Sequence, residues 1–102
     1  MNILQKIVDL SKRDQFSVFA RNAKLMEEIG EFSEALLHNQ GLLPHKQMKE
    51  PLEGEVADVI ICLLYTYLVT NPSLTAQDLQ RTIGEQLNKK LMKWEQILNE
   101  RS

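Results

Sequence analysis

The sequence predicts an all-α protein built from four helices. Apolar residues recur at helical spacing through most of the chain, and no segment shows the alternation of apolar and polar residues that is typical of a strand. Gly41 and Pro72 fall where helical patterns stop. With 102 residues the chain has the length of a single domain with a modest core, which we assign to residues 1–102.

The first two helices follow from local patterns. Ile3 to Leu10 has an apolar stripe and predicts an amphipathic helix, followed by a polar bend at 11–15. A second helix is expected from about Ser17 to Asn39, because Gly41 occupies a typical position for a glycine after a helix C-terminus.

The third and fourth helices follow a connection at residues 41–50. Pro51 fits the first turn of a third helix that continues to about Thr70, and the residue before Pro72 is pushed out of helical geometry. Thr75 with Asp78 resembles a capping arrangement that opens a fourth helix reaching nearly to the C-terminus.

The third helix is apolar on every side. Asp58 is the only carboxylate between Val56 and Val69, and such a helix is usually buried in a core or a subunit interface. Since one small chain offers little to cover it, we expect a homodimer or homotetramer formed through the flank of this helix around Ile60, Leu64 and Tyr67. The alternative is burial by helices of the same chain.

Composition excludes several classes of partner. The net charge is −2 and Lys and Arg form no cluster, so a nucleic-acid partner is not expected. The longest apolar run is too short to span a membrane, and the N-terminus lacks the apolar core of a signal peptide. Cys62 lies inside the apolar run, which predicts a small buried residue. We therefore expect a cytoplasmic protein.

Two carboxylate pairs are the main candidates for chemistry. Glu28 and Glu31 are three residues apart on the second helix, and Glu55 and Asp58 are three apart on the third, so each pair lies on one helix face. If the two faces meet, four acids repel one another and favour a bound cation. Oxygen ligands favour Mg²⁺, with Mn²⁺ possible. The alternative is a set of acids that are solvated or paired in salt bridges.

The neighbours of these acids support the metal hypothesis. Glu28 lies beside the apolar stripe of its helix and Glu31 at the edge of that stripe, whereas Glu27 points away. A di-iron centre would need histidine three residues after glutamate, a spacing that neither His38 nor His45 has.

The two motifs, Glu27-Glu28-Ile29-Gly30-Glu31 and Glu55-Val56-Ala57-Asp58, resemble those of MazG-like nucleotide pyrophosphohydrolases. These belong to the all-α nucleoside triphosphate pyrophosphatase superfamily, which is related to dimeric dUTPases. The resemblance covers about residues 15–95. It implies a four-helix bundle completed by homo-oligomerisation, with Mg²⁺ bound by Glu28, Glu31, Glu55 and Asp58. It also makes Glu31 and Glu28 the candidate catalytic residues, with Glu31 orienting or deprotonating the attacking water.

Substrate contacts are expected from the fourth helix and from the start of the second. Asn88, Lys90 and Lys93 are similar to the Asn-x-Lys-x-x-Arg/Lys element of the family, and Lys90 borders an apolar stripe. The alternative is that the lysines only solvate the helix. Gln15 and Phe16 match positions where relatives place a residue that faces the base, although Phe16 and Phe19 at helical spacing favour core positions.

The resemblance implies hydrolysis of nucleoside triphosphates, with deoxynucleotides as the expected substrates, to a monophosphate and pyrophosphate, in a role that cleanses the nucleotide pool. One alternative is a base-selective enzyme similar to a dUTPase or dCTPase. The other is a non-catalytic helical interaction module whose acids are structural or bind a partner.

Overall fold

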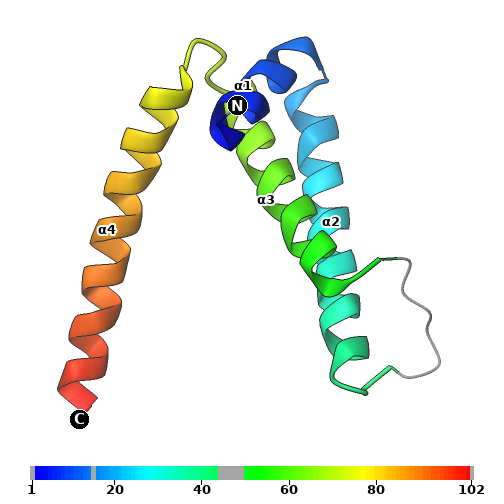
Figure 1. Ribbon diagram of the computed structural model, residues 1–102, viewed down its shortest axis with the longest axis vertical. Coiled ribbons are helices and arrows are strands. Elements are labelled where there is room, and N and C mark those ends of the chain that lie inside the picture. The colour runs from blue at the N-terminus through cyan, green and yellow to red at the C-terminus, as the bar shows by residue number, and fades with distance from the viewer. Residues whose placement is uncertain (1, 15, 44–49, 102) are drawn as a thin grey trace.

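The computed structural model describes residues 2–14, 16–43 and 50–101, and within these ranges the protein is all-helical (Figure 1). The helices are α1 (Ile3–Arg13), α2 (Val18–Asn39), α3 (Leu52–Val69) and α4 (Ala76–Arg101). The predicted all-α class and the order of four helices are confirmed.

The helix ends have local causes, and the sequence indicated two of them, Gly41 and the Thr75–Asp78 pair. Ser17 Oγ accepts a hydrogen bond from the Ala20 amide at 3.1 Å and caps α2. Gly41, at φ 78°, ends α2 with a backbone conformation that other residues rarely adopt. The Thr75 hydroxyl accepts from the Asp78 amide, and the Asp78 carboxylate accepts from the Thr75 amide, so the predicted capping arrangement at α4 is confirmed. Pro51 lies one residue before α3 rather than in its first turn.

The hydrophobic core lies at one end of the molecule. α2 and α3 run side by side, and α1 packs against the C-terminal part of α3 and the start of α4 (Figure 1). The buried core residues here come from α1, α3 and α4: Ile7, Val8, Leu68, Ala76 and Leu79. The first turns of α3, which carry Glu55 and Asp58, lie at the other end of that helix.

The fourth helix leaves this core and diverges from α2 and α3 (Figure 1). Every residue from Glu85 to Arg101 is exposed, and this part of α4 packs against no other described helix. The four helices of one chain therefore do not form a closed bundle. Of the described helices, none is long and apolar enough to cross a membrane.

The apolar third helix is only partly covered. Cys62 is buried, as predicted, whereas Ile60 and Tyr67 on the expected flank are exposed. Leu64 was expected on the same open flank, and this is wrong: it packs against the core. The reason is helical spacing, because Leu64 lies one turn from buried Leu68 and shares its face.

Candidate metal centre

Carboxylates of α2 and α3 meet around Glu55. One oxygen from each of Glu28, Glu31 and Glu55 lies within 4.8 Å of the others. In a second group, one oxygen from each of Glu50, Glu55 and Asp58 also lies within 4.8 Å of the others. Glu55 belongs to both groups, so the structure gathers all four acids singled out by spacing around one side chain.

Glu50 is a member of this cluster that the sequence analysis missed. It precedes α3 and falls outside the periodic part of the helix, so no amphipathic pattern identifies it. Its side chain lies over Gly54, where a Cβ atom would stand 3.2 Å from the Glu50 carboxylate. Gly54, the third residue of α3, therefore leaves room for the Glu50 side chain.

Two of the acids are buried with unsatisfied oxygens. Glu28 is 7% and Glu55 6% exposed, and in each of them Oε2 is buried without a hydrogen-bond partner. A buried carboxylate oxygen without a donor is costly, and a bound cation removes that cost. Several oxygen donors, two of them unsatisfied, match the preferences of a hard divalent ion such as Mg²⁺. The residues present therefore fit the expected metal.

The cluster has a strongly negative potential. The charge of Glu28, followed by desolvation, raises the pKa of Glu31 above its usual range. The hydrogen bond with Asp58, together with desolvation and the charges of Asp58 and Glu55, raises the pKa of Glu50 to about 7. Both shifts show that adding negative charge here is unfavourable when no cation is bound.

Lys24 is the one cation that contacts the cluster among the described residues. Its Nζ lies 3.1 Å from Glu28 Oε1 and 3.7 Å from Glu27 Oε1. The hydrogen bond to Glu28 is the main cause of a raised Lys24 pKa. Glu27 is thus paired with Lys24 and belongs to neither group of clustered acids, which agrees with its predicted direction away from the stripe. Lys24 was not predicted as part of the site, although its position one turn before Glu28 is a signal that could have identified it.

A polar contact between α2 and α3 fixes how the two helices face each other. Arg21 places its guanidinium 3.8 Å from the centre of the Tyr65 ring and donates a hydrogen bond to Cys62 Sγ at 3.3 Å. Tyr65 in turn donates from its hydroxyl to the backbone carbonyl of Asp14. Burial raises the pKa of Tyr65, so the hydroxyl stays protonated and able to donate. This contact lies two turns along α3 from Glu55 and helps to hold the acids of the two helices opposite one another.

The expected substrate contacts are not brought to the acids within one chain. Asn88, Lys90 and Lys93 lie on the exposed half of α4, which contacts neither α2 nor α3 in the part of the chain that the structure describes. Gln15 and His45 lie outside the described residues.

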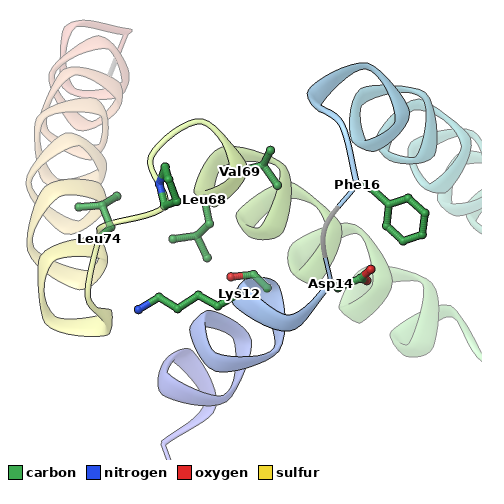
Figure 2. A pocket seen from close by; sticks show the side chains of 8 residues that line it. Lys12, Asp14, Phe16, Leu68, Val69 and Leu74 are labelled. Atoms are coloured by element: carbon green, nitrogen blue, oxygen red, sulfur yellow. The ribbon is translucent and has the colours of Figure 1, made fainter.

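The preference for Phe16 and Phe19 as core residues is wrong, because they are 57% and 88% exposed. Phe16 precedes α2 and Phe19 lies in its first turn, beyond the reach of the core. Phe16 instead borders a shallow cavity of about 270 Å³ at the end of α1, with Lys12, Asp14, Leu68 and Leu74 (Figure 2). This cavity contains none of the clustered acids.

Comparison of the chain with protein-family models found no match, and searches of curated proteins and of solved structures also found no match.

Proposed function

We propose that this protein is a Mg²⁺-dependent nucleoside triphosphate pyrophosphohydrolase that releases a nucleoside monophosphate and pyrophosphate. The observation that carries the proposal is the pair of buried, unsatisfied oxygens of Glu28 and Glu55 inside a larger carboxylate cluster. The motif spacing at 27–31 and 55–58 supports the substrate class, by resemblance to MazG-like enzymes. Deoxynucleotides are the proposed substrates, and the cytoplasm is the proposed location.

Glu28, Glu31, Glu55 and Asp58 would hold the ion, with Glu50 beside them. Mg²⁺, when bound, neutralises charge on the phosphate chain and makes a coordinated water more acidic. Glu31 is the more exposed acid of its group, so its carboxylate is the one best placed to contact an attacking water and act as the base. The base accepts a proton from water as the water oxygen forms a bond to the α-phosphorus, and the bond from that phosphorus to pyrophosphate breaks.

Cationic side chains are needed to bind the outer phosphates. Lys24 lies at the edge of the cluster, and releasing it from Glu28 when a metal binds would free its ammonium group for a phosphate oxygen. Lys90 and Lys93 remain proposed phosphate contacts, but the exposed position of α4 means that this helix must rearrange for them to reach the acids.

The proposal is tested by measuring pyrophosphate and monophosphate release from the common ribo- and deoxyribonucleoside triphosphates with and without Mg²⁺. We expect metal-dependent release that is lost in Glu55→Gln and kept in Glu85→Gln, which changes an exposed acid on α4. Activity confined to one pyrimidine base would favour the base-selective alternative. No release from any nucleotide, together with no effect of Mg²⁺ on thermal stability, would refute the proposal and favour the interaction module.

A further inference from the structure

The third helix has an apolar stripe that nothing in the described chain covers. It consists of Val56, Ile60, Leu63 and Tyr67, which are between 37% and 52% exposed. Their spacing of four, three and four residues places them along one side of the helix. This side lies opposite the face that carries Glu55 and Cys62, which packs against α2.

The fourth helix has a second stripe with the same spacing. It consists of Leu87, Leu91, Trp94 and Leu98, which are between 48% and 61% exposed. The opposite side of α4 is mainly polar and includes Gln96, although the exposed Met92 also lies there. An exposed helical segment of this length has little stability by itself in water, so it needs a partner surface to remain ordered. Contiguous apolar stripes that are left uncovered are typical of a surface that binds a partner.

The two stripes are complementary in length and in charge. When α3 and α4 are aligned antiparallel, Tyr67 meets Leu87, and the four pairs continue to Val56 with Leu98. The same register places Glu53, in the first turn of α3, opposite Arg101, in the last turn of α4. α3 contains three acids and no basic residue, so its surface offers no competing repulsion for this cation.

The chain's own α4 is poorly placed to use this register. Leu68 of α3 and Leu79 of α4 belong to the same core cluster, to which α1 also contributes. In the antiparallel register that aligns these two leucines, Trp94 falls opposite Glu53 and Leu98 passes beyond the start of α3. Folding α4 back onto its own α3 would thus leave two of the four apolar residues of α4 uncovered. A second copy of the chain has no such restriction on register.

We propose that the α4 stripe of one copy covers the α3 stripe of a second copy, and the reverse, in a symmetric dimer. This inference does not depend on the proposed hydrolysis. The interface lies behind the acids of α3, on the side away from α2, so it would hold α3 in place without blocking the carboxylate cluster.

Cross-linking between differently tagged chains tests the arrangement. One chain carries Ile60→Cys and the other Trp94→Cys, both in a Cys62→Ala background, and the mixture is refolded together and oxidised. We expect a disulfide between the two tagged chains. A matched control replaces Trp94→Cys with Gln96→Cys on the polar side of α4, which should not cross-link.

The other outcomes overturn the proposal. Trp94→Cys chains that cross-link only with each other would show α4 packed on α4. No cross-link in the mixture, together with a disulfide in chains that carry both cysteines, would show closure of α4 on its own α3. No cross-link in either experiment would refute the pairing of these stripes.

The end charges provide an independent test in otherwise unaltered chains. Either Glu53→Arg or Arg101→Glu should raise the dissociation constant of the dimer several-fold, because each places like charges opposite one another. The double variant should restore tight association. Leu91→Ala should raise the dissociation constant of the dimer by about tenfold or more, as expected for a central apolar contact. A wild-type monomer at micromolar concentration in sedimentation experiments, or additive effects of the two charge reversals, would contradict the proposal.

Discussion

Replacing Glu55 by glutamine should stabilise the metal-free protein and remove its response to Mg²⁺. Glu55 is the acid shared by both carboxylate groups, it is buried, and its Oε2 has no hydrogen-bond partner. Glutamine keeps the shape and removes the charge. The same substitution therefore has opposite effects on the apo protein and on cation binding.

The magnitude follows from the spacing of the acids. Two carboxylate charges 4.8 Å apart repel each other by about 3 kcal/mol at an effective dielectric constant of about 20. Partial protonation of the neighbouring acids reduces this, so we expect a gain of about 1–3 kcal/mol. For a domain of this length, the gain corresponds to a rise in Tm of at least about 4 °C.

The assay is thermal unfolding with and without Mg²⁺. Wild-type protein should gain about 2.7 kcal/mol when Mg²⁺ is present at about a hundred times its Kd, and Glu55→Gln should gain almost nothing at the same concentration. Glu85→Gln should unfold and respond like the wild type. A variant that is less stable than the wild type without metal, or that keeps the full Mg²⁺ response, would refute the electrostatic reasoning.

Three further predictions concern other residues. Glu28→Gln and Asp58→Asn should each abolish Mg²⁺-dependent pyrophosphate release while circular dichroism shows unchanged helix content; near-normal turnover in either would remove that acid from the metal site. Because the pKa of Glu50 is raised from 4.5 to about 7, the native metal-free protein binds more protons than the unfolded chain across this window. Its urea-measured stability should therefore fall as pH rises from 4.5 to 7, and Glu50→Gln should flatten the profile. At α4, hydrogen bonds from the backbone and hydroxyl of Thr75 lower the pKa of Asp78 below 3.8. The stabilisation by Asp78 is thus present above pH 3.8 and lost as pH falls through the folded pKa, so Asp78→Asn and wild type should converge in strong acid; a constant difference would contradict this linkage.

Local features of the sequence predicted the four helices and most of their ends, although α1 continues to Arg13, past the start of the bend expected at 11–15. Helix ends depend on neighbouring residues, so the Gly41 turn and the Thr75–Asp78 capping arrangement were readable from the chain, whereas the Ser17 cap was found only in the structure. Spacing within a helix likewise identified the acids that meet at Glu55, because residues three apart share a face.

Features that depend on tertiary arrangement were not readable. Glu50 joins the acids because a connecting segment folds over Gly54, and no periodic pattern marks such an approach. Phe16 and Phe19 were assigned to the core by their spacing, yet spacing defines a face and not whether another element covers it. The exposure of α4 was unpredictable for the same reason. Its apolar stripe was visible in the sequence, but the surface that would cover the stripe was not.

The assignment of a metal site is tested most directly by anomalous diffraction from crystals of the wild-type protein grown with Mn²⁺ in place of Mg²⁺. We expect a strong anomalous peak that marks Mn²⁺ beside a carboxylate oxygen of Glu55. Further oxygens from Glu28, Glu31 or Asp58 should lie about 2.0–2.2 Å from the ion, close to the Mg²⁺–oxygen distance. Crystals of Glu55→Gln grown in the same solution should lack this peak. A wild-type cluster without anomalous density at millimolar Mn²⁺, with the acids arranged as described, would contradict the assignment.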